Sequence, residues 1–338
     1  SSNSNRTFTL DPYDNLTAGT TYLTRVTTGV KDTAGNTLSS QYETSSGFTT
    51  TSSSSSSSSS GVFVAVGDSG NILRSTDNGS SWANASTPLG SGLYAVTFGN
   101  NTFVAIGNAG KFVKSTDNGS SFDNVTSGIG KNTSDVTFGN NTFIAVAHTG
   151  TIVRSTDNGS SWNNATSGTN NNLNGVGFGN NTFVVVGSSG NILKSTDNGS
   201  SWDNVTSGTS QQLNNVTFGN NTFVGVGDNG NILRSTDNGT NWDNATSGIT
   251  TDIRGVTFGN NTFVGVGSGG KIVRSMDNGS SWDNATSPIT TNIPGVTFGN
   301  NTFVAVGASG NIVRSTDNGS SFDNVTSGTS QSLRGVAF

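Results

Sequence analysis

One octet, Ser75-Thr76-Asp77-Asn78-Gly79-Ser80-Ser81-Trp82, sets the architecture of the chain because it recurs at a fixed spacing. Equivalent octets begin at residues 115, 155, 195, 235, 275 and 315, so seven copies follow one another every 40 residues without an insertion. A period of about 40–45 residues that contains four short strands is typical of a β-propeller. The sequence therefore predicts an all-β fold in which each repeat forms one blade.

Four strands can be assigned within a repeat. In the repeat that starts at Val96, the expected strands are 96–98, 102–107, 111–116 and a fourth that begins at Phe122. The turns between them are 99–101, 108–110 and 117–119. These turns are rich in Asn and Gly, which tolerate positive φ.

The two ends of the repeat array complement each other. The array begins at Gly61 with a second strand and ends at 333–338 with a sequence that matches a first strand. We expect the C-terminal strand to complete the first blade, which removes an open sheet edge. Residues 61–338 are thus predicted to form a seven-bladed propeller closed by the C-terminal strand.

The N-terminal part lacks the repeat. Within residues 1–50, the segments 6–10, 20–28 and 47–50 look like strands, and 32–36 looks like a turn. Residues 51–60 are a Thr/Ser tract of the kind found in flexible linkers. A β unit of this size has a very small core and is marginal alone.

Composition excludes several classes of protein. The chain has 338 residues, 30% of them hydrophobic, no cysteine and a formal net charge of -5. No apolar stretch approaches the roughly 20 residues of a membrane-spanning helix. The lack of cysteine excludes a disulfide scaffold and a thiolate metal site. The acidic balance argues against nucleic acid as the main partner.

The octet resembles the Asp-box of the sialidase-like and BNR-repeat propellers. The Val-Gly-x-x-Gly-x-Ile phrase beside it is similar to that of the photosystem II assembly-factor propellers and their bacterial relatives. The resemblance implies that the box lies between the third and fourth strands, away from the binding face. Its carboxylate can accept backbone N–H bonds in the turn, whereas one Asp per turn supplies few ligands for a metal, so we expect no metal and no cofactor. The aspartates assigned to this structural role are Asp77, Asp117, Asp157, Asp197, Asp237, Asp277 and Asp317.

Residues 6–50 resemble the C-terminal half of a bacterial Ig-like domain. The resemblance rests on Asn15–Tyr22, Val30–Asn36 and Gly47–Thr50. The other half of such a domain is missing, so either the chain is a fragment of a longer protein or strands from another chain complete the sheet. The second explanation favours a homo-oligomer or filament formed through residues 1–50.

The sialidase resemblance calls for a test of catalytic residues. The family uses a Tyr nucleophile with a Glu, an Asp acid and three Arg, but the repeats contain one Tyr, Tyr94, and no Glu. A glycosidase also needs two carboxylates across a cleft. The Asp residues outside the boxes and outer strands are scattered over different blades. We therefore expect no enzyme activity.

Differences among the repeats concentrate in the turn after the second strand and in the connection to the next blade. These two regions share the face opposite the Asp-boxes, and binding residues tend to lie on loops that a rigid scaffold holds. Neutral drift in loops explains the same pattern and is favoured for any single residue. The candidate ligand-binding residues are Tyr94, Lys131, Asp135, His148, Asp228, Asp252 and Arg254.

A basic residue precedes each box Asp by three positions, as Arg74 does. A ring of seven cations could bind an anion. However, the basic residue is present in every blade, which favours a structural contact between blades over a ligand site. Low charge, polar β repeats and the Ser/Thr tract favour an extracellular or cell-surface protein of a prokaryote. The leading hypothesis is a non-catalytic structural or adhesive surface module, including a self-assembling filament subunit. The alternatives are a protein-binding assembly or scaffold factor, and a glycan-binding propeller or glycosidase.

Overall fold

The computed structural model describes residues 20–31, 34–45, 47–49 and 61–338, and contacts divide the chain into two units, Ser1–Ser59 and Ser60–Phe338. The expected strand 6–10 and the Thr/Ser tract 51–60 lie outside the described residues. The first unit contains two antiparallel strand pairs, β1 with β4 and β2 with β3. Their bounds are β1 (Thr21–Tyr22), β2 (Arg25–Val26), β3 (Tyr42–Glu43) and β4 (Phe48–Thr49).

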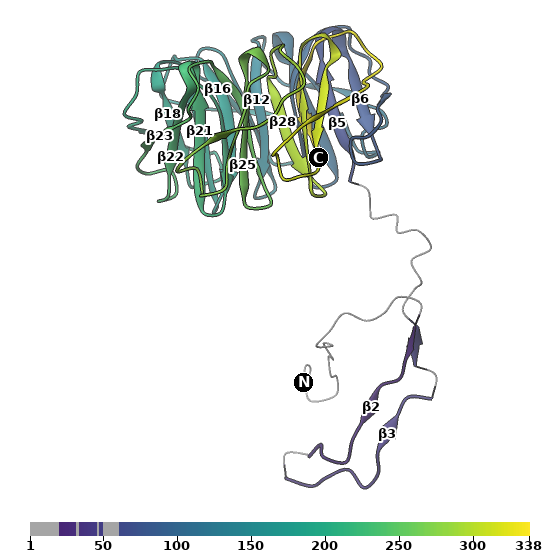
Figure 1. Cartoon of the computed structure of the whole chain (residues 1–338). Coiled ribbons are helices and arrows are strands. Elements are labelled where there is room, and N and C mark those ends of the chain that lie inside the picture. Colours follow the sequence, from purple (N-terminus) through teal and green to yellow (C-terminus); the bar gives the residue numbers. More distant parts are fainter. Residues whose placement is uncertain (1–19, 32–33, 46, 50–60) are drawn as a thin grey trace. The chain divides into compact units, whose positions relative to one another are not determined.

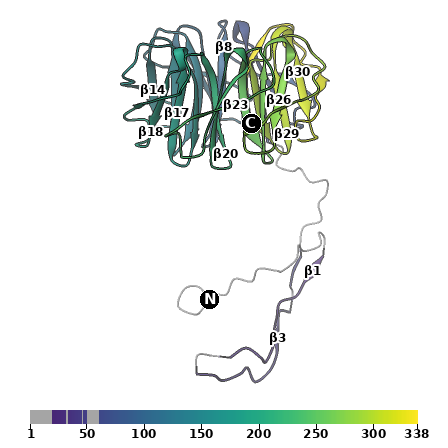
Figure 2. The same cartoon turned by 60° about the vertical axis from the view of Figure 1, so that its left-hand side comes forward.

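The second unit consists of seven antiparallel sheets of four strands each, arranged around a ring (Figures 1 and 2). The innermost strand of each sheet contacts the innermost strands of its two neighbours. This arrangement confirms the predicted all-β, seven-bladed propeller. Blade 1 contains β5 and the following blades are numbered in chain order.

The strand bounds follow the 40-residue period. The innermost strands are β8 (Leu93–Gly99), β12 (Thr133–Gly139), β16 (Leu173–Gly179), β20 (Leu213–Gly219), β24 (Ile253–Gly259), β28 (Gly295–Gly299) and β32 (Leu333–Ala337). The second strands are β5 (Phe63–Gly67), β9 (Thr102–Gly107), β13 (Thr142–Ala147), β17 (Thr182–Gly187), β21 (Thr222–Gly227), β25 (Thr262–Gly267) and β29 (Thr302–Val306). The third strands are β6 (Ile72–Ser75), β10 (Lys111–Ser115), β14 (Thr151–Ser155), β18 (Ile192–Ser195), β22 (Asn231–Ser235), β26 (Ile272–Ser275) and β30 (Ile312–Ser315).

The outermost strands are short. They are β7 (Ala83–Asn84), β11 (Asp123–Thr126), β15 (Asn163–Ala165), β19 (Asp203–Val205), β23 (Asp243–Thr246), β27 (Asp283–Asn284) and β31 (Asp323–Val325). In six blades the second and third strands are joined by a single 3-10 turn. These turns are η1 (Asp68–Gly70), η2 (Asn108–Gly110), η3 (Ser188–Gly190), η4 (Asp228–Gly230), η5 (Ser268–Gly270) and η6 (Ala308–Gly310).

The C-terminal strand β32 completes blade 1, as the sequence predicts. It pairs with β5 in antiparallel register, with Leu333 opposite Gly67 and Val336 opposite Ala65. The ring is thereby closed by strand pairing between the two ends of the repeat array.

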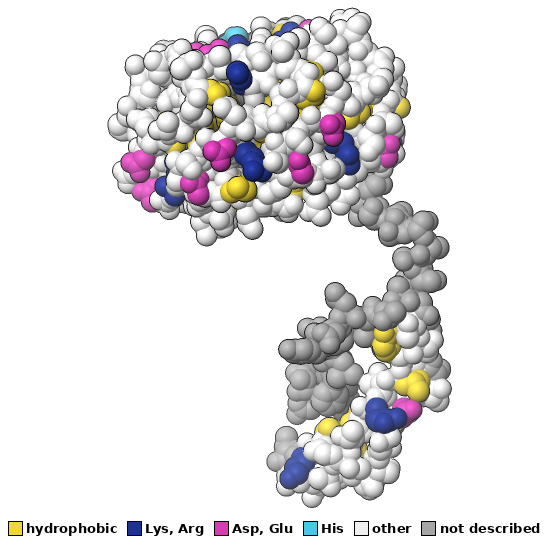
Figure 3. All heavy atoms as spheres, viewed as in Figure 1, with side chains coloured by type: hydrophobic (Ala, Val, Ile, Leu, Met, Phe, Trp, Pro, Cys, Tyr) yellow, Lys and Arg dark blue, Asp and Glu magenta, His cyan; other side chains and the backbone are white. Residues whose placement is uncertain are grey.

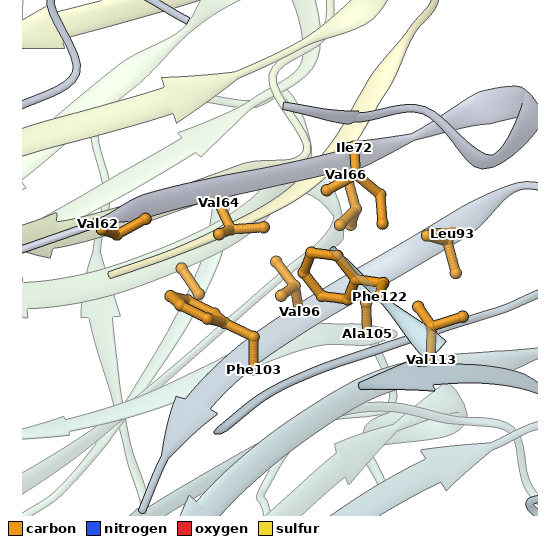
Figure 4. Close-up of a cluster of buried hydrophobic side chains, with 11 residues drawn as sticks. Val62, Val64, Val66, Ile72, Leu93, Val96, Phe103, Ala105, Val113 and Phe122 are labelled. Carbon is orange, nitrogen blue, oxygen red and sulfur yellow. The ribbon is translucent and has the colours of Figure 1, made fainter. Parts of the chain in front are cut away.

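The apolar core lies between neighbouring blades. All six residues of β9 are buried, because the sheets on both sides cover this second strand. Figure 4 shows the cluster between blades 1 and 2, where Val64 and Ile72 of one blade meet Phe103 and Val113 of the next. Burying one side chain of this size contributes about 1.5–3 kcal/mol to stability.

Close approach between innermost strands explains one repeated glycine. The ring of Phe138 packs on Gly99 of the preceding blade, where a Cβ atom would lie 2.1 Å from the ring. The same contact recurs up to Phe338 on Gly299. Only glycine leaves room for the aromatic ring at this position.

The innermost strands begin earlier than the sequence analysis predicts. We expected 96–98 to be strand and the preceding residues to be loop, but β8 begins at Leu93. A β-bulge between Leu93 and Ala95 interrupts the alternation of inward and outward side chains. The sequence at the start of the strand therefore lacks the alternation of apolar and polar residues that marks a strand. As a correction, Tyr94, Asp135 and Arg254 lie on innermost strands and not in connecting loops.

Candidate functional site

The Asp-box forms the turn between the third and fourth strands. In blade 3, Asp157 accepts hydrogen bonds from the Ser155 hydroxyl (2.8 Å) and from the Ser161 amide (2.9 Å) and hydroxyl (2.6 Å). The bond from the Ser161 hydroxyl is the main reason why the pKa of Asp157 falls to about 2. Because the turn uses both carboxylate oxygens, this aspartate stabilises the hairpin.

Each box is also tied to the preceding blade. In blade 4, the Asn198 side chain donates to the Thr142 hydroxyl (2.8 Å), and the Asn198 carbonyl accepts from Arg154 Nε (2.9 Å). These basic residues thus contact the box turn of the next blade, which favours the interpretation that they join blades. The seven are Arg74, Lys114, Arg154, Lys194, Arg234, Arg274 and Arg314.

The opposite side of the ring, which we call the variable face, carries the turns between the second and third strands and the first residues of the innermost strands. Around the ring axis it is hollowed by a depression of about 330 Å³, the central depression. One repeat position supplies a side chain to its wall from every blade. These residues are Tyr94, Ser134, Asn174, Asn214, Arg254, Pro294 and Arg334.

The two cations at this position are held by carboxylates. Arg334 donates to both oxygens of Asp68, from Nε (3.0 Å) and Nη2 (2.9 Å), and these bonds raise its pKa further above the ordinary value. Arg254 pairs with Asp252 (3.3 Å) and donates to the Ser268 hydroxyl (3.0 Å). The pairing fixes both guanidinium groups and offsets their charge locally.

Neutral side chains of the wall are fixed in the same way. The Tyr94 hydroxyl donates to the Asn108 side chain. Asn214 donates to Asp228 (3.0 Å). In both cases the partner lies in the turn between the second and third strands, so that turn positions the residue on the innermost strand.

Asp135 lies on the wall of the depression and links three blades. Its carboxylate accepts hydrogen bonds from the Val136 amide in blade 3 (2.9 Å), the Val176 amide in blade 4 (2.9 Å) and the Asn215 side chain in blade 5 (3.1 Å). Burial raises the pKa of Asp135 to about 7. Asp135 is therefore an acid whose protonation changes near neutral pH.

The seven predicted residues divide into two groups. Tyr94, Asp135 and Arg254 line the central depression, and Asp228 and Asp252 hold its wall residues. Lys131 and His148 do not line the depression. Lys131 borders a separate groove of about 570 Å³ and donates to Thr149 and Thr151, and His148 is exposed in the turn between β13 and β14.

Three further wall residues, Arg334, Asn214 and Asn215, are not among the residues predicted from the sequence. Arg334 and Asn214 stand at the repeat position of Tyr94 and Arg254, and Asn215 stands at that of Asp135. Comparing whole repeat positions would have found them. Among the described residues, no group of three or more His, Cys, Asp or Glu side chains could hold a metal ion. In the same described part, no helix is long and apolar enough to span a membrane.

The fold and the boxes define the class of the protein as a seven-bladed Asp-box β-propeller with a further N-terminal unit. Residues 114–271 match the family model of the photosynthesis system II assembly factor YCF48, and residues 1–50 match that of a bacterial Ig-like domain. The chain thus combines a β-propeller that is similar to YCF48 over residues 114–271 with an N-terminal segment that is similar to a bacterial Ig-like domain. No curated protein matches the chain significantly.

Solved structures resemble the propeller at low sequence identity. YCF48 bound to D1 peptide has a TM-score of 0.61 and 18% identity, covering 78% of this chain and 87% of that one. YCF48 from Cyanidioschyzon merolae has a TM-score of 0.60 and 19% identity, covering 74% and 90%. The WD40 propeller domain of Doa1 has a TM-score of 0.59 and 15% identity, covering 75% and 86%. At these identities the likeness shows the fold alone.

Proposed function

We propose that this protein is a non-catalytic scaffold that binds a protein partner in the central depression of the variable face. The observation that carries the proposal is the wall position itself. The boxes and the second and third strands are nearly constant, yet this position holds Tyr, Ser, Asn, Arg and Pro in different blades. A surface adapted to one partner must break the sevenfold symmetry, whereas a purely structural position can keep it.

Several side chains of the wall are held in fixed positions without a bound partner. Tyr94, Arg254 and Arg334 are each held by a hydrogen bond or ion pair to a neighbouring turn. Side chains that are already ordered lose less conformational entropy on binding. Tyr and Arg are also the residue types that dominate binding energy at protein interfaces.

The chemistry of the wall favours an uncharged polar stretch of polypeptide. Both arginines are paired with aspartates, which reduces their attraction for a strongly anionic ligand. Asn174 Nδ2 donates to the Leu213 carbonyl, and the side-chain oxygen of Asn174 can accept a hydrogen bond from a peptide N–H. The structure of YCF48 bound to D1 peptide gives a propeller of the same fold with a peptide ligand.

The test compares two triple variants of the full chain. The depression variant is Tyr94→Ala with Arg254→Ala and Arg334→Ala, and the control is Thr76→Ala with Thr116→Ala and Thr156→Ala, which are exposed on the Asp-box face. A partner captured by the wild-type protein should bind the depression variant at least about tenfold more weakly, and the control unchanged. Equal affinity of the two variants would rule out the central depression as the binding site.

A second candidate function is self-assembly through the Ig-like unit, as a structural or adhesive surface module outside a prokaryotic cell. Four large apolar side chains of this unit are exposed, Leu23 by 51%, Val30 by 50%, Leu38 by 39% and Tyr42 by 60%. Apolar side chains beside short strands favour pairing with a second copy of the chain. Light scattering should then show oligomers that Leu23→Ser with Val30→Ser and Tyr42→Ser abolishes. A wild-type protein that is monomeric at high concentration would contradict this candidate.

A further inference from the structure

Asn-x-Ser/Thr triplets, which are potential acceptors of N-linked glycans, recur at three positions of the propeller repeat, and two single triplets begin at Asn132 and Asn215. One set lies in the boxes, as in Asn158-Gly159-Ser160. Another lies in the turn between the first and second strands, as in Asn100-Asn101-Thr102. The third lies on the outermost strands, as in Asn124-Val125-Thr126. The structure separates the three sets, because an acceptor needs both a free amide nitrogen and an accessible hydroxyl two residues later.

In the box set the amide nitrogen is occupied. Asn158 Nδ2 donates to the Thr102 hydroxyl of the neighbouring blade at 2.7 Å. Asn118 is the exception, because Val62 stands where the other blades have threonine, and Asn118 is exposed. The six bonded box residues are Asn78, Asn158, Asn198, Asn238, Asn278 and Asn318.

In the turn set the hydroxyl is inaccessible. Thr102 is only 1% exposed, because its hydroxyl receives the bond from the box asparagine. The threonine of this triplet is equally buried in the other five copies. These residues are Thr142, Thr182, Thr222, Thr262 and Thr302.

In the outermost strands both groups are accessible. In β11, Asn124 and Thr126 are exposed and Val125 between them is half-buried. The period of two in a strand places the asparagine and the hydroxyl on the same face. Within residues 61–338, the outermost strands carry seven such asparagines, and the only hydrogen bond to their side chains is the one that Asn204 Oδ1 accepts. Every Nδ2 of the seven is therefore free. The seven exposed asparagines are Asn84, Asn124, Asn164, Asn204, Asn244, Asn284 and Asn324.

We propose that the outermost strands are N-glycosylation sites, one on each blade. An oligosaccharyltransferase would join Asn Nδ2 to the anomeric carbon of a lipid-pyrophosphate-linked oligosaccharide. The bond between that carbon and the phosphate oxygen breaks, the lipid pyrophosphate leaves with the electron pair, and Nδ2 gives up one proton. The middle residue of the triplet is Ala or Val, and the third residue is Ser in one blade and Thr in the other six. All seven blades therefore have a hydroxyl at the third position.

Glycans at these positions would protect the sheet edges. The outermost strands are the edges of seven sheets, and single bridges at Ser86, Thr246 and Thr286 pair only the ends of these segments with the next blade. Unpaired strand edges invite pairing with other chains. Figure 3 shows charged side chains of both signs in a row along the lower part of the propeller's side and a largely uncharged surface above it. A ring of glycans around the circumference would cover the edges and leave the variable face open.

The test is peptide mapping of the protein isolated from its own cells, by tandem mass spectrometry that keeps glycans attached. We expect glycan masses on the outer-strand asparagines and none on the six bonded box asparagines. Thr126→Val should abolish modification of Asn124 alone, whereas Thr126→Ser should retain it. The control Thr116→Val removes an exposed hydroxyl outside any triplet and should change nothing.

Three results would overturn the proposal. The first is that the outer-strand asparagines carry no glycan in the native protein. The second is that Asn124 is still modified in Thr126→Val. The third is that the bonded box asparagines are modified to the same extent as the outer-strand asparagines. All of these results are independent of partner binding in the central depression.

Discussion

Aspartate has two opposite roles in this propeller, and the surroundings of each carboxylate decide which. The box aspartates are exposed and accept several hydrogen bonds, which stabilise the charged form, so the pKa of Asp197 falls to about 2. Asp135 also accepts three hydrogen bonds, but burial outweighs them and raises its pKa to about 7. The box carboxylates remain charged at neutral pH, whereas Asp135 is poised to change its charge.

The raised pKa of Asp135 predicts an unusual pH dependence of stability. Between about pH 4 and 7 the folded protein binds this proton and the unfolded chain does not, so the free energy of unfolding falls as pH rises. A shift from 3.8 to about 7 corresponds to a loss on the order of a few kcal/mol. Denaturant unfolding at pH 5 and pH 8 should show this loss for the wild type and a smaller one for Asp135→Asn. Parallel pH profiles for the two proteins would show that Asp135 is not the titrating group.

The hydrogen bonds of the box predict a stability cost for losing its aspartate. Asp197 accepts from the Ser195 and Ser201 hydroxyls and from the amides of Ser200 and Ser201. Asp197→Ala should therefore lower the free energy of unfolding by about 1–3 kcal/mol in urea denaturation. The control Asp203→Ala, at an exposed site on β19, should change it by less than about 0.5 kcal/mol. The same cost for both variants would contradict a structural role of the box.

Blades are joined by hairpins that reach across the gap between sheets. A basic side chain and a threonine hydroxyl of one blade bind the box turn of the next, and the apolar cluster lies between them. The first blade shows what happens without the threonine, because Val62 leaves Asn118 exposed. The contact between blades therefore does not rest on this hydroxyl alone, because blades 1 and 2 are joined without it by Arg74 and an apolar cluster.

The threonine at the start of the second strand should be sensitive to loss of its hydroxyl. Thr262 is 1% exposed and accepts a hydrogen bond from Asn318 Nδ2 at 2.7 Å. Thr262→Val keeps the volume but leaves that amide unpaired, which should lower the free energy of unfolding by about 1–3 kcal/mol. Thr257→Val in the same blade should have little effect, and thermal unfolding of both variants checks the difference. A loss that is no larger than that of Thr257→Val would show that the Asn–Thr bond does not hold the blades together.

At the scale of strands, the sequence predicted most of the architecture because the 40-residue period is unbroken. The hairpins were predictable from Asn and Gly, as at Asn100, where φ is +49°. The start of each innermost strand was not predictable, because the bulge before Ala95 removes the alternation that marks a strand. The candidate residues Tyr94, Asp135 and Arg254 were therefore found as variable positions but assigned to the wrong element.

At the scale of the whole molecule, the site exists only because the ring closes. Residues that are 40 positions apart in the sequence, such as Arg254, Pro294 and Arg334, come together around one depression. Sequence periodicity shows that these residues share a position but cannot show that the position faces the axis. For this reason Tyr94 and Arg254 were selected from the sequence while Arg334 was missed.

The most direct test of partner binding places a photoreactive amino acid at Tyr94 in the full chain. A matched protein carries it at Thr76, which is exposed on the opposite face. After irradiation with the proteins of the producing cell, we expect a covalent adduct with one partner polypeptide from position 94 and none from position 76. An adduct from position 76 alone, or none from position 94, would contradict the account that the central depression binds a protein.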